Sequence, residues 1–292
     1  MKTKLIINPT AGRGRARKAI PRIKEIFRNR KIDFHTSVTD YYNQATHLAK
    51  EASLNGFELI IAAGGDGTVN EVVNGMLESK SCLGVIPLGI GNDFARALNM
   101  PFELEKACDI ICKDFELKTI DAGKINERYF INGIGIGFDA WVARESRWIR
   151  RFSFPGCVYF FAVISTLFKY KTSSLRINFD DTVLEKKILL VAIGNGKSSG
   201  AGFLLTPEAE IDDGLIDVCV VDDISRLKIL MHLPRAIKGT LETLPYVKTF
   251  KTKKLSIQSR DSLLAHVDGE LLESCDYQIQ VLPKKLKVII PK

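Results

Sequence analysis

Three glycine-rich turns are the residues of this sequence whose types and spacing best suit phosphate chemistry. They occupy residues 8–14, 64–68 and 89–93, and each follows an apolar run and precedes a helical pattern. Glycines let the backbone approach a polyphosphate closely, and the helix N-termini behind them present free N–H groups and a positive dipole end. One such turn could serve only to reverse the chain, whereas three at successive strand ends favour a shared phosphate site.

Two carboxylates within these turns are candidates for holding a metal ion on the phosphates. Asp66 lies between glycines in the second turn, and Asp93 ends the third. Carboxylate oxygens are the hard ligands that Mg²⁺ prefers, although both residues could instead cap helices, as could Thr68. The glycine spacing matches neither the P-loop nor the dinucleotide-binding fingerprint, so neither motif is indicated.

The elements that would position these turns alternate in the first part of the chain. Short apolar runs predict strands, and helical spacing of apolar residues follows each of them, as with Ala16, Ile20, Ile23 and Phe27. This alternation indicates a parallel sheet with helices on its faces, and the carboxyl edge of such a sheet gathers the turns. The predicted strands cover residues 5–7, 34–38, 59–62 and 83–87.

The pattern changes near residue 120, where β-rich runs replace the alternation. Mostly sequential strands, interrupted by helical stretches at about 138–170 and 225–239, predict an antiparallel, sandwich-like part of the chain. The last strands are expected at residues 254–258, 263–267, 277–281 and 285–290. We therefore expect an α/β domain over residues 1–121, to which the extreme C-terminus, about 288–292, could return. A mostly β domain would cover residues 122–287.

The charge balance points to a local anionic partner. The chain has 292 residues, with 42 Lys and Arg against 34 Asp and Glu, and a net charge of +8. Residues 1–35 contain 11 basic and two acidic residues, so this window is net +9 and the rest of the chain sums to −1. Phosphates, nucleic acid or an anionic membrane would suit such a segment. Aromatic residues that could stack on bases do not interleave with these charges, so nucleic acid is not expected.

The cysteines and the apolar segments favour a cytoplasmic protein. Six scattered cysteines without a C-x-x-C pair are typical of buried thiols in a reducing compartment. The first residues hold too short an apolar run for a signal peptide. The longest uncharged stretch, residues 152–168, is short for a bilayer span, so it predicts a buried or interfacial helix.

Several of these motifs together resemble the diacylglycerol kinase catalytic family, which includes bacterial lipid kinases, sphingosine kinases and ceramide kinases. Residues 64–75 read Gly-Gly-Asp-Gly-Thr-Val-Asn-Glu-Val-Val-Asn-Gly and resemble the family signature. The first turn resembles the first nucleotide loop of the family. Residues 87–96 resemble its next element, with Ile90 where threonine is usual, which removes a hydroxyl from the expected nucleotide pocket. Later matches follow in the expected order at residues 194–196, 207–209, 212–217 and 268–270.

The resemblance implies an ATP- and Mg²⁺-dependent lipid kinase. Its nucleotide domain would be similar to those of NAD kinase and phosphofructokinase, and its β-rich domain would take the lipid. Glu270 would be the general base on the lipid hydroxyl, with Asp66 and Asp93 beside the catalytic Mg²⁺; from the residues alone, Glu270 could be a solvated side chain at an Asp-Gly hairpin. The nucleotide would be held by Asn8, Pro9, Thr10, Ala11, Gly12, Thr39, Gly65, Asp66, Gly67, Thr68, Val69, Asn70, Glu71 and Ile90.

The resemblance also implies a structural Mg²⁺ in the second domain. Asp213 would supply its carboxylate, and the backbone carbonyls of Glu210 and Leu215 would complete the protein ligands. One carboxylate with carbonyls and waters is a reasonable set for a hard cation. The alternative for this Asp-Gly sequence is a turn between two strands.

A predicted helix from residue 138 favours contact with a membrane. Trp141, Arg144, Trp148 and Arg151 fall on one stripe, and tryptophan alternating with arginine suits a lipid interface better than a core. The alternative is an ordinary surface helix whose tryptophans pack at the domain junction. We expect peripheral association with an anionic membrane surface that contains the lipid substrate.

Conversion of diacylglycerol to phosphatidic acid with ATP is therefore the first functional hypothesis. Kinases of phosphatidylglycerol or of a sphingoid base are alternatives with the same chemistry, and an NAD kinase-like enzyme also uses Gly-Gly-Asp-Gly-Thr. A membrane-associated regulatory protein that retains the fold is the non-enzyme alternative. The sequence leaves the oligomeric state open, with a homodimer as one candidate.

Overall fold

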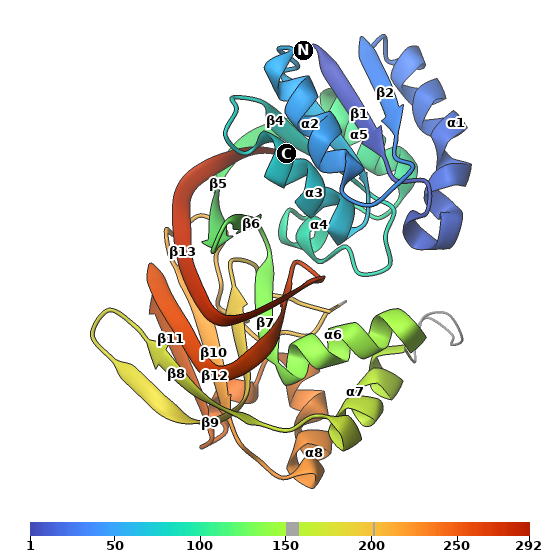
Figure 1. The fold of residues 1–292 in the computed structure, drawn as a ribbon. Coiled ribbons are helices and arrows are strands. Elements are labelled where there is room, and N and C mark those ends of the chain that lie inside the picture. The colour runs from blue at the N-terminus through green and yellow to red at the C-terminus, as the bar shows by residue number, and fades with distance from the viewer. Residues whose placement is uncertain (150–157, 201) are drawn as a thin grey trace. The chain divides into compact units, whose positions relative to one another are not determined.

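The computed structural model describes residues 1–149, 158–200 and 202–292, which divide into two compact units (Figure 1). Unit 1 comprises Met1–Ala122 and Pro283–Lys292, and unit 2 comprises Gly123–Leu282. The sequence placed the boundary after residue 121 and the return at about residue 288. The return begins earlier because the last strand, β13 (Glu270–Pro291), runs unbroken from unit 2 into unit 1.

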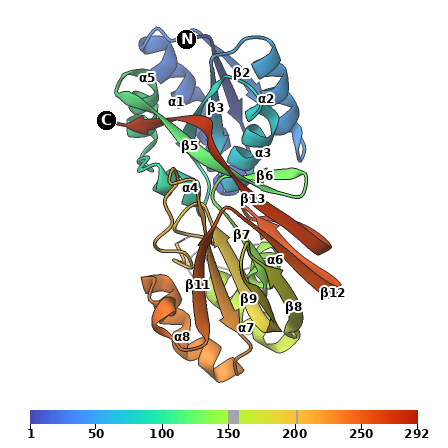
Figure 2. The same ribbon diagram turned by 90° about the vertical axis from the view of Figure 1, so that its left-hand side faces the viewer.

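Unit 1 is built around a parallel sheet with strand order β2-β1-β3-β4-β13, as the alternating pattern predicted. Figure 2 shows α1 and α5 on one side of this sheet and α2 and α3 on the other. The strands are β1 (Thr3–Ile7), β2 (Phe34–Val38), β3 (Leu59–Gly64) and β4 (Cys82–Pro87), with β5 (Phe115–Ile125) pairing β13. The helices are η1 (Ala11–Gly14), α1 (Arg15–Asn29), α2 (Gln44–Leu54), α3 (Asp66–Met76), α4 (Asp93–Ala97) and α5 (Leu104–Lys113).

The burial in unit 1 follows directly from its sequence. All residues of β3 and β4 are buried, as expected for central strands covered on both faces. The basic helix α1 buries its apolar side and exposes its charges, some of which α5 neutralises. Arg22 pairs with Glu105 at 3.1 Å, and Arg30 pairs with Asp109 at 2.7 Å. Part of the positive charge of the N-terminal window is therefore balanced within unit 1.

Unit 2 is mostly antiparallel β structure, which confirms the expected β-rich second domain. Pairings β8–β9, β9–β7, β7–β12 and β12–β8 close a ring of four strands. A core of mainly Ile, Val and Leu side chains packs against these strands. The strands are β6 (Arg128–Phe130), β7 (Gly133–Gly137), β8 (Ser173–Asn178), β9 (Val183–Gly194), β10 (Ile216–Asp222), β11 (Val247–Thr252) and β12 (Lys254–Val267).

Three helices pack through a second apolar cluster that includes side chains of β9 and β10. They are α6 (Phe138–Ile149), α7 (Val158–Lys169) and α8 (Arg226–Lys238), and a short η3 (Leu241–Thr243) follows. The single helical stretch expected over about 138–170 thus contains two helices. None of the helices in the described ranges has both the length and the apolar character needed to span a bilayer.

The cysteines are not all buried, contrary to the expectation from their spacing. Cys82, Cys108 and Cys219 are buried, and burial raises the pKa of each thiol to about 12. Cys275 is exposed, because it lies on the solvent side of β13, and Cys157 lies outside the described residues.

Candidate functional site

The first two glycine-rich turns of unit 1 contact each other through side chains. Asn8 Nδ2 donates to Thr68 Oγ1 at 3.1 Å, while Asn8 Oδ1 accepts from the N–H of Thr10 at 3.0 Å and from its hydroxyl at 2.8 Å. The expected cap by Thr68 is not formed: the N-cap residue of α3 is Gly65, and no side chain caps it. Thr68 lies past the cap position, so its hydroxyl joins the two turns instead.

The third turn approaches the first two so closely that only glycine is accommodated. A Cβ on Gly89 would lie 2.4 Å from the Cα of Gly65, and a Cβ on Gly12 would lie 2.2 Å from the carbonyl oxygen of Leu88. Gly12 also has φ +59°, a left-handed conformation that glycine adopts without strain. The tertiary structure therefore brings all three predicted turns together, with their backbones in contact.

Arg15 is a positioning residue of these turns that the sequence reasoning did not identify. Its Nη2 donates to the carbonyl oxygens of Leu88 at 3.3 Å and Gly89 at 2.5 Å. The side chain at the start of α1 thus holds the third turn against the first. The sequence signal for this role was the position of Arg15, directly after the first turn and within the basic window of residues 1–35.

Asp66 is the first residue of helix α3, and its side chain reaches the first turn of helix α4, which begins at Asp93. Its Oδ1 accepts from the N–H of Phe94 at 3.2 Å. Asp66 therefore binds a free N–H group at the start of α4, as in the helix-capping alternative. Asp93 is buried, with 5% of its surface exposed. The neighbouring Asn92 closes the turn, since its Oδ1 accepts from the N–H of Gly89 at 2.9 Å. The structure therefore brings the two carboxylates expected beside the catalytic metal into one cluster of turns.

Three of the residues expected to hold nucleotide serve the packing of α3. Val69 and Asn70 are buried, with 2% and 0% of their surfaces exposed. Glu71 turns toward α2, where its Oε2 accepts from the N–H of Ala45 at 3.2 Å. These positions support the second turn from behind, because the side chains point into unit 1.

The remaining expected nucleotide residues lie in or near the turns. Pro9, Thr10 and Ala11 belong to the first turn and the start of η1, and Gly67 lies in the first turn of α3. Thr39 is buried just after β2, and its N–H donates to the carbonyl of Ile7 at 2.9 Å. Ile90 is 39% exposed at the tip of the third turn, so an apolar side chain faces solvent where threonine is usual.

In unit 2, Glu270 begins β13 directly after a two-residue hairpin turn. Asp268 and Gly269 have φ +47° and +86°, and Val267 pairs with Glu270 across the turn, as expected for a type I′ hairpin. The Glu270 side chain is only 18% exposed and forms an ion pair with Arg147, whose Nη2 lies 2.9 Å from Oε2. The Asp-Gly hairpin turn is therefore formed. The side chain of Glu270, however, is held by its ion pair with Arg147 and is not simply solvated.

Asp268 anchors this hairpin through its side chain, a role that the sequence did not reveal. Its carboxylate accepts three backbone N–H groups, from Ile131 at 2.9 Å, Asn132 at 3.0 Å and Gly133 at 2.8 Å. The residue is buried, with 6% of its surface exposed. Carboxylates held by several N–H groups make strong, charge-assisted hydrogen bonds, so the position of Glu270 depends on this residue.

Helix α6 contacts the strand and hairpin that carry Glu270 at two places. Near its start, Asp139 Oδ2 lies 2.9 Å from His266 Nε2 on β12. Near its end, Arg147 Nη2 donates to the carbonyl of Gly269 at 2.6 Å as well as pairing with Glu270. The helix thus orients the hairpin and its carboxylate.

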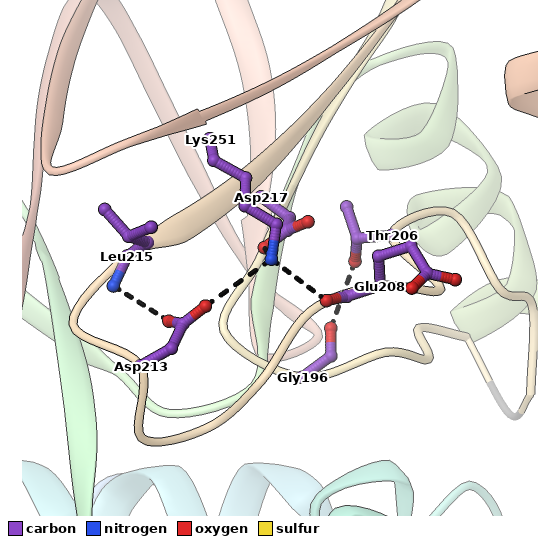
Figure 3. A network of polar contacts seen from close by, with 7 residues as sticks. All are labelled: Gly196, Thr206, Glu208, Asp213, Leu215, Asp217 and Lys251. Carbon is purple, nitrogen blue, oxygen red and sulfur yellow. Dashed lines mark hydrogen bonds and ion pairs between the residues drawn. The ribbon is translucent and has the colours of Figure 1, made fainter.

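Figure 3 shows the surroundings of Asp213, the residue expected to bind a structural Mg²⁺. Asp213 Oδ1 accepts from the N–H of Leu215 at 2.9 Å, and Oδ2 lies 3.4 Å from the ammonium of Lys251. The same ammonium lies 3.4 Å from Asp217 Oδ2 and donates to the carbonyl oxygen of Glu208 at 3.2 Å. The chain's own cation therefore contacts two carboxylates and a carbonyl.

These charges depend on one another. Burial raises the pKa of Asp217, and Lys251 opposes that shift. Partial burial works against the charge of Lys251, yet Asp217 and Asp213 hold its pKa above the usual value. Both oxygens of Asp213 contact groups of the chain itself, so with Lys251 in place a divalent ion would share this carboxylate with them. The Mg²⁺ site expected from Glu210, Asp213 and Leu215 stays a prediction. The Asp-Gly turn was the alternative for this segment. Among the described residues, no group of three or more His, Cys, Asp or Glu side chains could hold a metal ion.

Two family models match this chain in succession. Residues 2–125 match the diacylglycerol kinase catalytic domain, and residues 132–290 match the YegS C-terminal NAD kinase β-sandwich-like domain. The chain belongs to the diacylglycerol kinase family. It is a lipid kinase, as the motifs of the three turns and of the late hairpin predicted.

Relatives support this membership over the whole chain. A diacylglycerol kinase of Bacillus subtilis (strain 168) is 30% identical over 294 residues, which cover 100% of this chain and 97% of that protein. One of Staphylococcus aureus (strain MRSA252) is 34% identical over 274 residues, covering 92% and 86%. A crystal structure of a diacylglycerol kinase from Bacillus anthracis str. Sterne has a TM-score of 0.78 at 26% identity, covering 99% of this chain and 96% of that one.

Proposed function

We propose that this lipid kinase transfers the γ-phosphoryl group of ATP to the hydroxyl of diacylglycerol and produces phosphatidic acid and ADP. The observation that carries the proposal is the full-length similarity to proteins named diacylglycerol kinase. The cluster of three turns in unit 1 supports ATP as the donor, because such backbone suits a polyphosphate. A peripheral position at the cytoplasmic face of a membrane would give access to this substrate.

In this proposal, the three turns of unit 1 bind the phosphates of ATP. Asn8, Thr68 and Arg15 hold the turns in contact with one another, so the backbone is arranged before the nucleotide binds. Such preorganisation lowers the cost of binding. Asp66 and Asp93 would hold Mg²⁺, which when bound neutralises charge on the transferred phosphoryl group.

Glu270 would accept the proton of the lipid hydroxyl. The hydroxyl oxygen forms a bond to the γ-phosphorus, the bond from that phosphorus to the β–γ bridging oxygen breaks, and the proton passes to the carboxylate. Arg147 and the hairpin anchored by Asp268 orient the carboxylate for this step. A positioned base of this kind contributes about 10²–10⁴-fold to the rate.

Three other acceptors are alternatives to diacylglycerol. The hydroxyls of phosphatidylglycerol or of a sphingoid base would require the same base and the same phosphate site. The match of the second unit to an NAD kinase β-sandwich-like domain makes NAD an acceptor that the assay must include. The acceptor preference distinguishes these candidates.

The decisive experiment is phosphoryl transfer from labelled ATP with Mg²⁺ to a panel of acceptors. Diacylglycerol, phosphatidylglycerol and a sphingoid base would be presented in mixed micelles, and NAD in solution. We expect diacylglycerol to give the highest kcat/KM. Glu270→Gln should lower kcat by about 10²–10⁴-fold while nucleotide affinity, measured separately, is retained.

Glu273→Gln is the matched control, since Glu273 lies exposed on the same strand. Its turnover should equal that of the unchanged chain. Faster transfer to NAD than to any lipid would refute the lipid acceptor. Near-normal turnover of Glu270→Gln would refute the role of Glu270.

A further inference from the structure

Helices α7 and α8 of unit 2 present large apolar side chains on their outer surfaces. Phe168 is 73% exposed, Leu227 68% and Met231 64%, and about half of Phe160 and Phe161 is exposed. We call these five residues the α7–α8 face. The two helices meet there, because the guanidinium carbon of Arg226 on α8 lies 5.8 Å from the ring centroid of Phe168 on α7.

The inner surfaces of the same helices are also apolar. Val163 and Leu167 of α7 and Ala236 of α8 are buried in the second core cluster of unit 2, with Leu233 packed against it. Helix α7 therefore has apolar side chains on most of its circumference. Helices of that composition are normally covered on all sides, and contiguous exposed apolar patches mark interaction surfaces.

The charged side chains on α7 and α8 themselves are all positive, while the exposed Asp223 lies three residues before α8. The two helices, which are described in full, contain no Asp or Glu, and their cations are Lys169, Arg226, Lys228, Arg235 and Lys238. The carboxylate of Glu145 on neighbouring α6 is turned inward, with 12% of its side chain exposed. It accepts from Ser165 Oγ and Lys169 Nζ, both at 2.7 Å. A partner of this surface should therefore be apolar within and anionic at its border.

We propose that the α7–α8 face docks on an anionic lipid bilayer. The aromatic and aliphatic side chains enter the boundary between headgroups and acyl chains, and the cations beside them meet lipid phosphates, as amphipathic interfacial helices do. The inference deepens the proposed function. It rests on that function in one respect, which is that the substrate is a membrane lipid.

This surface differs from the α6 stripe expected from the sequence. Trp141 is half-buried, and the guanidinium carbon of Arg144 lies 3.6 Å from its ring centroid, so these two side chains pack against each other. Trp148 is 64% exposed, and Arg151 lies outside the described residues. More large apolar side chains are exposed on α7 and α8, next to the cations of α8.

The test is co-sedimentation of the full chain with phosphatidylcholine vesicles, with and without phosphatidylglycerol, in the absence of nucleotide. We expect tighter binding when phosphatidylglycerol is present. Each cation near such a surface contributes about fivefold to affinity, so Arg226→Gln with Lys228→Gln should weaken binding about 25-fold. The triple change Phe168→Ser, Leu227→Ser and Met231→Ser should reduce binding to the level of the bare phosphatidylcholine background.

Controls of the same chemistry lie elsewhere on the chain. Lys24→Gln with Arg28→Gln removes two cations of α1, and Leu54→Ser with Val183→Ser removes two exposed apolar side chains outside the α7–α8 face. Both double variants should bind vesicles like the unchanged chain. Equal melting temperatures would show that every variant is folded.

Three outcomes would overturn the proposal. The triple variant could bind as tightly as the unchanged chain, or binding could be independent of phosphatidylglycerol. Size-exclusion chromatography could also show a dimer that the triple variant dissociates while vesicle binding persists, which would assign the face to a second copy.

Failure of the proposed function is separable from these outcomes. Transfer to a short-chain diacylglycerol in detergent micelles should be unchanged in the triple variant. If the unchanged chain does not phosphorylate that lipid, the proposed acceptor is refuted, whereas the vesicle result still decides the docking face.

Discussion

Asp268 provides a direct test of how the hairpin that carries Glu270 is held. Its buried carboxylate accepts N–H groups from Ile131, Asn132 and Gly133 at 2.8–3.0 Å. Asp268→Asn keeps one acceptor oxygen for Asn132 and Gly133 but places an amide donor against the N–H of Ile131. Asn-Gly suits a type I′ turn as well as Asp-Gly does, so the change isolates the loss of the carboxylate.

The expected loss of stability follows from these three contacts. A hydrogen bond to a charged group contributes about 1.5–3 kcal/mol. Asp268→Asn loses one such bond, and the acceptor of the other two bonds is no longer charged. We therefore expect unit 2 to lose about 3 kcal/mol of unfolding free energy. Asp268→Ala loses all three bonds and places alanine at φ +47°, which adds about 1 kcal/mol and brings the loss to at least about 5.5 kcal/mol.

Urea unfolding followed by tryptophan fluorescence measures this loss. Both tryptophans, Trp141 and Trp148, lie on α6, so the signal reports unit 2. Asp261→Ala is the control, because Asp261 is exposed on β12 and its loss should change stability by less than about 0.5 kcal/mol. A loss below about 1 kcal/mol in both Asp268 variants would refute the anchoring role.

Two further predictions concern other charges of unit 2. Lys251→Met leaves Asp213 and Asp217 without their shared cation, so we expect a loss of about 2 kcal/mol, between the values for exposed and buried pairs. Without nucleotide, Mg²⁺ should raise the melting temperature of that variant and not of the unchanged chain; equal shifts would show that Lys251 does not exclude the ion. Burial opposes ionisation of Glu145, yet hydrogen bonds from Lys169 and Ser165 hold its pKa below the usual value. The stability lost in Glu145→Gln should therefore be present above the unfolded pKa and disappear as the pH falls through the folded one; a difference independent of pH contradicts this.

Local patterns predicted most elements of unit 1. The expected strand over residues 34–38 coincides with β2, and the helix expected from Asp93 begins there as α4. Both depend on side chains only a few residues apart, such as an apolar run or a glycine-rich turn before a helix. The same reasoning located the three turns at strand ends, because parallel strands place their carboxyl ends at one edge of the sheet.

The long strands of unit 2 were less predictable. Residues 254–258 and 263–267 were expected as two strands, but they form one strand, β12, whose pairing register shifts between Gln258 and Leu263. Likewise β13 continues through Lys284, which has φ +50°, where the sequence predicted two strands. Such irregularities interrupt the alternation of apolar and polar residues that marks a strand.

The sequence by itself determined the order of elements, the glycine-rich turns and the hairpin before Glu270, because each depends on residues that are neighbours along the chain. Only the tertiary structure decided which groups these elements meet. Asp268 accepts from Gly133, which is 135 residues away, and Lys251 contacts Asp213 from a distance of 38 residues. The packing of strands against one another selects these partners. From the sequence alone, Asp268 and Asp213 therefore looked like ordinary turn residues, and only the fold showed that one holds the hairpin and the other contacts Lys251.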